Sequence, residues 1–312
     1  MQAFVDTMRE TFASLGMTEE LSFSFTSETA LDKLCVPMDS HLRRAIPIMN
    51  PLTDEYPLVR TTLLTSILEN AARNVARKNL DLRLFDIAPV FFPKALPLTE
   101  LAEEKLKVAG LLTGRRSPIA WDTDNTVVDF YDAKGVLERF LTVIGVQKYT
   151  VERGEHFAMH PGKTAFFKKG RDVIAVLGEI HPTVAANFGI GQNVYVFEMD
   201  AETLLRYRRK RSTIKPLPKY PASARDLAIL VDADLTTAEI ERVIAKKGGK
   251  YFRHATLFDI YAGKQVGEGK KSMAFHLHFQ SDDKTLTDEE VDAAFAAILQ
   301  AVEEQLHAQL RG

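Results

Sequence analysis

The sequence contains 312 residues with a formal net charge of −2 at pH 7, and 46% of its residues are apolar and 26% charged. This length, at roughly 100–200 residues per domain, predicts two domains of an ordinary globular protein, and the small net charge does not indicate a chain that binds nucleic acid over its whole surface. The single cysteine, Cys35, excludes an internal disulfide and a cysteine-based zinc site, and the lack of a signal-peptide pattern or an apolar run of about 18 residues predicts a cytoplasmic protein without a membrane span.

The first part of the chain alternates predicted helices and strands. Apolar residues at helical spacing predict a helix over residues 2–15, and Gly16 stands where that helix would end. Alternating apolar residues favour a strand over 21–25. A second helix is predicted over 57–76, followed by a strongly apolar strand over 82–92.

Further elements follow at irregular spacing. They are a strand over 107–112, a helix over 129–144, and short strands over 165–167, 173–177 and 194–199. Because strands and helices do not alternate in a regular repeat, the pattern favours an α+β fold with an antiparallel sheet over a βαβ fold.

The clearest domain boundary is a basic, proline-containing stretch over residues 206–221. Eight basic residues, no acidic residue and three prolines lie between Arg206 and Arg225. Prolines block a helix and favour an extended linker. We therefore expect a first domain over 1–205, the linker over 206–221, and a second domain over 222–312.

The second domain shows a compact pattern of six elements. They are a strand over 226–231, a helix over 236–246, strands over 251–261 and 272–280, a helix that begins at Thr287, and a short strand near Leu310. Glu290, three residues after Thr287, completes a capping box. This order predicts a ferredoxin-like α/β sandwich.

Segments from both domains resemble one family. Residues 225–231, 257–280 and 284–291 and the final Leu310–Arg311 resemble, in order and spacing, the ferredoxin-fold anticodon-binding domain of phenylalanyl-tRNA synthetase β subunits. The segments that resemble the catalytic-like module of the same subunit are 50–74, 82–92, 160–163, 178–182 and 196–200. The resemblance implies an antiparallel-sheet, class II synthetase-like domain followed by the ferredoxin-like sandwich. It also implies a piece of a longer subunit whose earlier modules, including an editing domain, are missing.

The resemblance further implies a function. The chain would be a non-catalytic region of phenylalanine–tRNA ligase that scaffolds the catalytic α subunit, in a heterotetramer of two α and two β subunits. It would bind the anticodon region of tRNA(Phe) in support of the ATP-dependent attachment of phenylalanine to tRNA. ATP and Mg²⁺ are then expected at the α subunit, with no cofactor or metal in this chain.

The catalytic positions of the family are changed here. Comparison with the α subunit puts Phe92 at a phosphate-binding arginine and Lys94 at an acidic residue of motif 2. It puts Glu198 and Asp200 at two glycines and Thr203 at the arginine of motif 3. An apolar ring cannot replace a guanidinium at a phosphate, and carboxylates repel it, so we expect the chain alone to be inactive.

Charge in the second domain predicts the side that binds tRNA. Residues 203–271 contain 16 basic and 7 acidic residues, whereas residues 272–312 contain 2 and 8. Clustered basic residues are the footprint of phosphate binding, and we expect the acidic last helix to face away. The candidate contacts are Lys219, Arg225, Arg253, Lys264, Lys270 and Lys271, with Tyr251 and Tyr261 as stacking faces. The alternatives are solvated lysines, and for Arg225 a salt bridge that fixes the first strand.

The helix over 57–76 has two interpretations. Its residues Leu63, Leu64 and Ile67 could contact a partner subunit or belong to the core. By the same resemblance, Arg60 lies near the interface or the former active site, or it forms a structural ion pair.

Several weaker signals remain. His276 and His278 share one face of a strand, the packing or RNA-facing side, but without a third ligand they do not predict a metal site. His160 and His181 each precede proline, which indicates turns. The competing functions are a generic RNA-binding or protein-interaction module that reuses the fold, and a stand-alone synthetase-like ligase.

Overall fold

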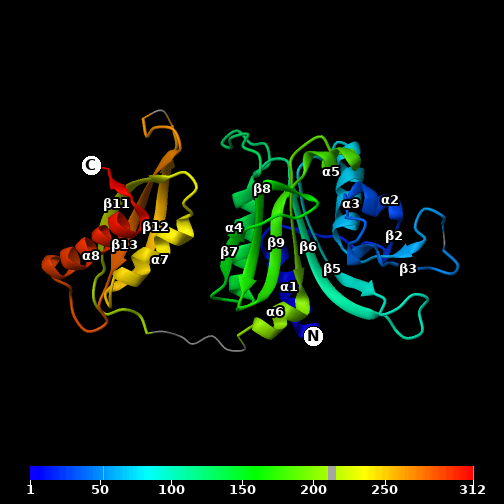
Figure 1. Ribbon diagram of the computed structural model, residues 1–312, viewed down its shortest axis with the longest axis horizontal. Coiled ribbons are helices and arrows are strands. Elements are labelled where there is room, and N and C mark those ends of the chain that lie inside the picture. Colours follow the sequence, from blue (N-terminus) through cyan, green and yellow to red (C-terminus); the bar gives the residue numbers. More distant parts are fainter. Residues whose placement is uncertain (52, 210–215, 264, 312) are drawn as a thin grey trace. The chain divides into compact units, whose positions relative to one another are not determined.

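The computed structural model describes residues 1–51, 53–209, 216–263 and 265–311. The chain divides into two compact units, residues 1–212 and 213–312, which are described separately (Figure 1). This division falls inside the basic stretch 206–221. Within the described ranges, none of the helices combines the length and apolarity needed to span a bilayer.

The first unit is built, within its described residues, on a seven-stranded sheet. In spatial order its strands are β1 (Thr18–Glu19), β5 (Leu82–Phe92), β6 (Glu103–Thr113), β10 (Val194–Asp200), β9 (Asp172–Ile180), β8 (Met159–Lys169) and β7 (Thr150–Arg153). Every neighbouring pair is antiparallel except β1 with β5. The predicted antiparallel α+β fold is therefore confirmed for this unit.

Helices cover both faces of this sheet (Figure 1). One face packs against α1 (Gln2–Ser14), α4 (Phe130–Val143) and α6 (Ala201–Tyr207), and the other against α2 (Glu28–Lys33), α3 (Leu64–Ala76) and α5 (Pro182–Asn187). The Phe12 ring from α1 stacks on Phe140 and Phe85, with centroids 4.2 and 5.1 Å apart. Such aromatic packing buries a large apolar area and fixes α1 on the sheet.

Two predicted elements differ from the structure. The helix predicted over 57–76 begins only at Leu64. The backbone of Arg60 forms hydrogen bonds with other segments instead: its N–H donates to the Ser24 carbonyl and its carbonyl accepts from the Phe91 N–H, both at 3.0 Å. The strand predicted over 21–25 is reduced to β2 (Phe25–Thr26). The small sheet that contains it is completed by β4 (Leu58–Val59) and β3 (Ile46–Pro47). A short 3₁₀ helix, His41–Arg43, precedes β3 in the chain.

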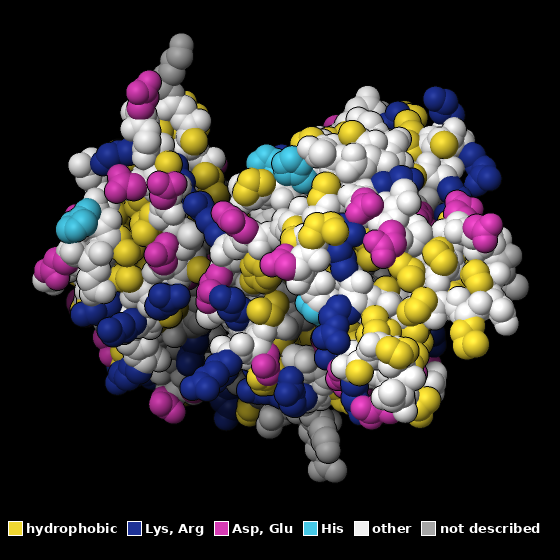
Figure 2. Space-filling view, turned by 45° about the vertical axis from the view of Figure 1, so that its right-hand side comes forward, with side chains coloured by type: hydrophobic (Ala, Val, Ile, Leu, Met, Phe, Trp, Pro, Cys, Tyr) yellow, Lys and Arg dark blue, Asp and Glu magenta, His cyan; other side chains and the backbone are white. Residues whose placement is uncertain are grey.

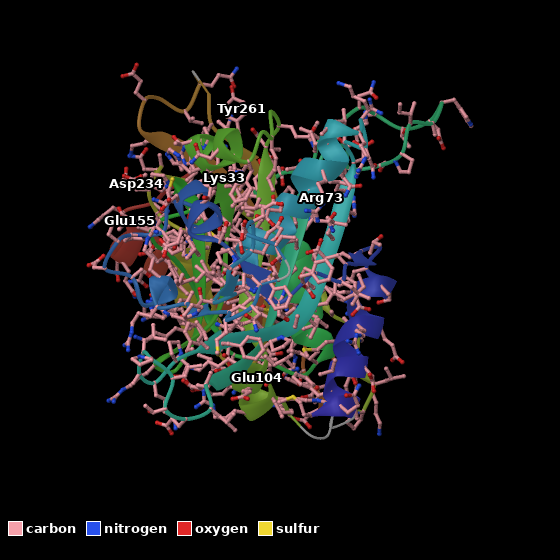
Figure 3. The ribbon with its side chains drawn as sticks, turned by 90° about the vertical axis from the view of Figure 1, so that its right-hand side faces the viewer. Lys33, Arg73, Glu104, Glu155, Asp234 and Tyr261 are labelled. Carbon is pink, nitrogen blue, oxygen red and sulfur yellow. The ribbon has the colours of Figure 1, made fainter. Side chains whose placement is uncertain are left out.

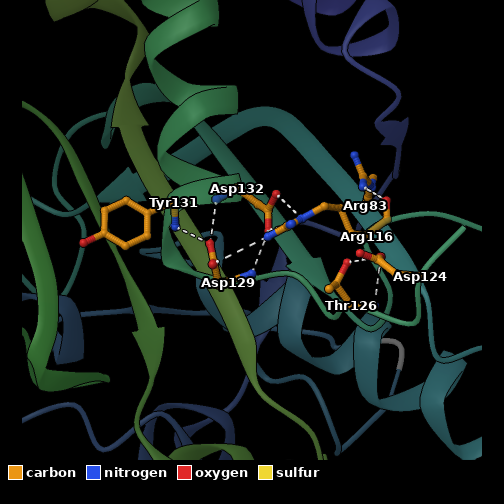
Figure 4. Close-up of polar contacts among 7 residues, drawn as sticks. All are labelled: Arg83, Arg116, Asp124, Thr126, Asp129, Tyr131 and Asp132. Carbon is orange, nitrogen blue, oxygen red and sulfur yellow. Dashed lines mark hydrogen bonds and ion pairs between the residues drawn. The ribbon is translucent and has the colours of Figure 1, made fainter. Parts of the chain in front are cut away.

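The loop between β6 and α4 is anchored by Arg116 (Figure 4). Its guanidinium pairs with Asp132 at 2.9 Å and Asp129 at 3.6 Å, and these two acids also form the capping box at the start of α4. The loop nevertheless leaves Trp121 almost fully exposed.

The second unit has the predicted ferredoxin-like order. Its strands, β12 (Phe252–Tyr261), β13 (Lys270–Phe279), β11 (Ser223–Asp232) and β14 (Gln309–Leu310), form one antiparallel sheet in that spatial order. Two helices, α7 (Thr237–Lys247) and α8 (Asp288–Leu306), pack on one face. All six predicted elements are confirmed, including the Thr287–Glu290 capping box. Within the described residues, no helix of this unit packs on the other face of the sheet.

Candidate functional site

The open face of the second unit's sheet carries a row of ring-bearing side chains. In β13, Phe275 and Leu277 pack in the core beneath the helices, so His276 and His278 point to the opposite face. His254 of β12 lies directly opposite His278 in the strand pair, and paired residues share a face. Three imidazoles from two strands therefore meet on the open side.

These rings form two stacked pairs. His254 and His278 stack with ring centroids 4.3 Å apart, and Phe258 stacks on His276 at 3.9 Å. Phe258 continues the alternation of His254 and Thr256 on the open face, at a bulge in β12 between Leu257 and Asp259. The Phe258 side chain is 50% exposed even with its partner in place.

Two further contacts fix this surface. The carboxylate of Asp226 on β11 accepts a hydrogen bond from His276 Nδ1 at 2.5 Å, which orients the imidazole. Tyr261, labelled in Figure 3, ends β12 opposite Ser272, on the same side of the sheet as His276. The Arg311 guanidinium lies 5.8 Å from the Tyr261 ring centroid. We call His254, Phe258, Tyr261, His276, His278 and Arg311 the ring face.

The ring face has the chemistry to hold unpaired bases. Flat aromatic and imidazole rings at an open sheet offer π-faces on which splayed bases stack, and Arg311 adds one cation. The sequence predicted that His276 and His278 share a face. It did not predict His254 or Phe258, because their places depend on the register and bulge of β12.

Two predicted tRNA contacts are engaged with acids instead. Arg225 lies on the helix side of β11 and donates to Asp288 at 3.0 Å and Asp292 at 2.9 Å, both on α8. The hydrogen bonds to these two carboxylates raise the pKa of Arg225. Arg253 pairs with Asp282 at 2.9 Å. The acidic first turns of α8 thus supply the partners of Arg225, on the face of the sheet opposite the ring face.

The remaining predicted contacts are dispersed. Tyr251 donates to Glu290 at 3.2 Å, and Lys271 donates to the backbone carbonyls of Ala233 and Leu235 at 2.9 and 2.6 Å. Lys219 is exposed and Lys270 is half-buried at the start of β13, whereas Lys264 lies outside the described residues. On the face that Figure 2 shows, acidic side chains lie among the basic ones.

The predicted interface residues lie in the interior of the first unit. The side chains of Leu63, Leu64 and Ile67 are buried in the core that α3 forms with the sheet. Arg60 is only 1% exposed. A residue at a subunit interface has to reach the surface of its own chain, and these four do not. The other interpretations given above apply instead: Leu63, Leu64 and Ile67 belong to the core, and Arg60 forms a structural ion pair.

Arg60 is the centre of a buried polar network. Its Nε donates to the Pro89 carbonyl at 2.9 Å, and its Nη1 donates to Ser22 Oγ at 2.6 Å and the Phe23 carbonyl at 3.2 Å. The buried Asp86 carboxylate lies 3.7 Å away and accepts from Ser22. Burial lowers the pKa of Arg60 and raises that of Asp86.

Glu20 extends this network. Its side chain is buried and accepts a hydrogen bond from Asn70 through one oxygen, whereas Oε1 has no hydrogen-bond partner within the described residues. Burial is the main reason that the pKa of Glu20 is raised to about 7, and the nearby Asp86 adds to it. The carboxyl therefore holds a proton in the folded chain that it loses in the unfolded chain.

Glu20 gives the first unit a pH-dependent stability. Its contribution to stability is fully present below pH 4.5, which is the ordinary pKa of a glutamate. This contribution is lost as the pH rises through about 7, because the folded state binds the extra proton. A shift of this size corresponds to roughly 3 kcal/mol. We expect Glu20→Gln to raise the free energy of unfolding at pH 8 and to change it little at pH 4.5. Urea unfolding at the two pH values measures this, and an equal change at both would contradict it.

Comparisons with known proteins identify the family. A family model described as the phenylalanyl tRNA synthetase beta chain CLM domain matches residues 1–201. The chain belongs to the phenylalanyl-tRNA synthetase β-chain family. A second model, described as a ferredoxin-fold anticodon binding domain, matches residues 218–311 and contains the ring face.

Individual relatives agree with this family. The phenylalanine–tRNA ligase β subunit of Syntrophotalea carbinolica is 38% identical over 309 residues, which are 98% of this chain and 38% of that protein. The corresponding subunit of Clostridium acetobutylicum is 36% identical over 312 residues, which are 100% of this chain and 38% of that protein. The chain therefore spans less than half the length of these curated relatives.

Solved structures support the fold. A crystal structure of pyrrolysyl-tRNA synthetase from Desulfitobacterium hafniense matches with a TM-score of 0.51 at 12% identity, over 65% of this chain and 67% of that one. At this low identity the likeness concerns the fold alone, and it agrees with the class II synthetase-like fold predicted from the sequence.

Two acidic residues that the sequence comparison placed at motif 3 positions have structural roles. Glu198 accepts from Thr62 Oγ1 at 2.8 Å and from the Leu63 N–H at 3.0 Å, so its carboxylate holds the start of α3. Asp200 caps α6 by accepting from the Thr203 N–H at 2.8 Å. Carboxylates in these positions do not fit the phosphates of ATP. The described residues contain no cluster of three metal-ligating side chains.

Phe92, which the sequence comparison placed in motif 2, borders a small pocket. Phe92 lines a hollow of about 200 Å³ together with His41, Arg44 and Lys105 and with Pro93 and Glu103. Lys105 Nζ lies 5.6 Å from the Phe92 ring centroid, and Lys94 is outside the pocket, paired with Glu100 at 2.6 Å. The sequence did not reveal Arg44 or Lys105 here, because no motif marks them. Thr203 is not among the lining residues.

Proposed function

We propose that this chain is the non-catalytic region of a phenylalanine–tRNA ligase β subunit that binds the anticodon region of tRNA(Phe) and docks on the catalytic α subunit. The observation that carries the tRNA part is the ring face on the open side of an anticodon-binding-domain fold. In the complete enzyme, expected to contain two α and two β subunits in the cytoplasm, the chain supports attachment of phenylalanine to tRNA.

The ring face fits an anticodon loop because loop bases are unpaired. Two stacked pairs on neighbouring strands give two adjacent platforms, and Phe258 and His276 are both about half-exposed. Each base stacked on such a ring contributes roughly 1–3 kcal/mol. Asp226, which holds His276, is also largely exposed and provides a carboxylate that can accept hydrogen bonds from base edges.

A different surface, on the first unit, supports docking of the α subunit. Residues 20–24 present polar groups inward: Glu20 contacts Asn70, and Ser22 joins the Arg60 network. The intervening apolar side chains point outward, so that Leu21 is 89% and Phe23 81% exposed. This reverses the usual arrangement of a surface segment, in which polar side chains face the solvent. Leu21 and Phe23 are thus held at the surface by the buried contacts of Glu20 and Ser22. A partner subunit that covers the two apolar side chains would explain this arrangement.

Catalysis belongs to the α subunit in this proposal. Because Glu198 and Asp200 hold helix starts, we place ATP and Mg²⁺ on the partner. The Phe92 pocket does contain cations, but Lys105 pairs with Glu103 at 3.3 Å. ATP–pyrophosphate exchange with phenylalanine by this chain alone would favour the stand-alone ligase.

The tRNA proposal is tested with the variants Phe258→Ala and His278→Ala. We expect each to weaken binding of a tRNA(Phe) transcript by about tenfold, since each removes a stacking ring. The dependence on salt should change little, because neither variant removes a cation. Filter binding at several salt concentrations measures both quantities.

The matched control is Lys246→Ala on α7, which covers the opposite face of the sheet. It should bind tRNA(Phe) like the unmodified chain. If the ring variants bind as tightly as the control, the ring face is not the tRNA site. Equal loss of binding for a tRNA with a different anticodon loop would favour the generic RNA-binding module.

A further inference from the structure

A pair of histidines in the first unit lies outside the functions proposed above. His160 in β8 and His181 immediately after β9 have ring centroids 6.3 Å apart and planes inclined by 28°. We propose that these two imidazoles form a site for a phosphate group, which they bind through their Nε2–H donors.

The sheet itself brings the two residues together. In the antiparallel pair β8–β9, Met159 lies opposite Ile180, and the register shifts between Met159 and Thr164, so that residues 160–163 bulge out of the ladder beside the end of β9. The His181 N–H then donates to the Ala158 carbonyl at 2.9 Å. The histidine pair is therefore placed by backbone hydrogen bonds and does not depend on flexible side chains.

Both rings are held in the same way. His160 Nδ1 accepts from the Gly162 N–H at 3.1 Å, and His181 Nδ1 accepts from the Thr183 N–H at 3.2 Å. A proline follows each histidine and fixes φ inside each turn. The two imidazoles are thus oriented before any ligand arrives, which reduces the entropy lost on binding.

These hydrogen bonds also determine the tautomer. An Nδ1 that accepts an N–H must carry a lone pair, so the proton of each neutral ring lies on Nε2. Within the described part of the chain, neither Nε2 has a hydrogen-bond partner. Two free N–H donors, on neighbouring and similarly inclined rings, therefore remain available to an acceptor.

This tautomer favours an anion over a metal ion. A metal at Nε2 would require the ring proton on Nδ1, where it would meet the backbone N–H of Gly162 or Thr183. The described residues also offer no third metal ligand here. The neighbouring Lys163 is paired with Glu179 at 2.6 Å, so this ion pair does not repel an anion. A phosphate, with several acceptor oxygens on one centre, fits two donors.

The proposal is tested by long-range ¹H–¹⁵N NMR of the imidazoles in the 312-residue chain. We expect the Nε2–H tautomer for His160 and His181, and selective shifts of both side chains when inorganic phosphate replaces chloride at equal ionic strength. A parallel titration uses a short single-stranded RNA. Shifts with inorganic phosphate alone assign the site to free phosphate, and shifts with RNA assign it to a strand backbone.

The variants His160→Asn and His181→Asn keep an oxygen that can accept the turn N–H but remove the Nε2–H donor. Each should abolish the phosphate-induced shift of the remaining histidine. His307→Asn is the control, since His307 is exposed, lies in the second unit and has a left-handed backbone that asparagine tolerates. The proposal is overturned by an Nδ1–H tautomer, by no selective shift with either ligand, or by equal shifts of all eight histidines.

Discussion

Replacing Arg60 by methionine is expected to destabilise the first unit by about 3–5 kcal/mol, the cost of breaking a buried ion pair by removing one partner. The change leaves the buried Asp86 without its cation and removes the donors that satisfy the Pro89 and Phe23 carbonyls. Methionine has a similar length, so the loss comes from unpaired polar groups and not from a large cavity.

Denaturant unfolding of the 312-residue chain measures this effect. The second unit contains none of the Arg60 contacts, so its transition is an internal reference. The double variant Arg60→Met with Asp86→Asn removes the stranded charge and should recover part of the loss. An unchanged first transition, with loss of subunit binding alone, would show that Arg60 acts at an interface after all.

The burial of Arg60 illustrates what the sequence could not reveal. Its partners Ser22, Asp86 and Pro89 are 38, 26 and 29 residues away in the chain, and local patterning does not indicate such distant contacts. The same limit applies to Arg225, whose acidic partners are 63 and 67 residues further on. Counting charges by segment cannot show that opposite charges will meet.

Local signals were sufficient elsewhere. The six elements of the second unit were predicted because caps, turns and apolar periods are short-range features, as in the capping box of Thr287 and Glu290. Strand alternation also placed His276 and His278 on one face. Their stacking partners His254 and Phe258 required the register of β12 and its bulge, which are set by tertiary packing.

The double variant Leu21→Asp with Phe23→Asp is expected to abolish assembly with the α subunit. Both side chains are more than four-fifths exposed in this chain, so the substitutions should change its own stability by little. Burying two carboxylates without partners against an apolar surface would weaken an interface by several kcal/mol, a loss of about a hundredfold or more in affinity.

Co-purification and size-exclusion chromatography with a phenylalanyl-tRNA synthetase α subunit measure this loss. The matched control, Leu21→Met with Phe23→Leu, keeps the surface apolar and should still assemble. Binding of tRNA through the ring face should persist in the aspartate variant, because Leu21 and Phe23 belong to the other compact unit. Unimpaired assembly of that variant would exclude residues 20–24 as the docking surface. Since the polar anchor of Glu20 and Ser22 would remain intact in both variants, the comparison isolates the outward apolar side chains from the network that holds them.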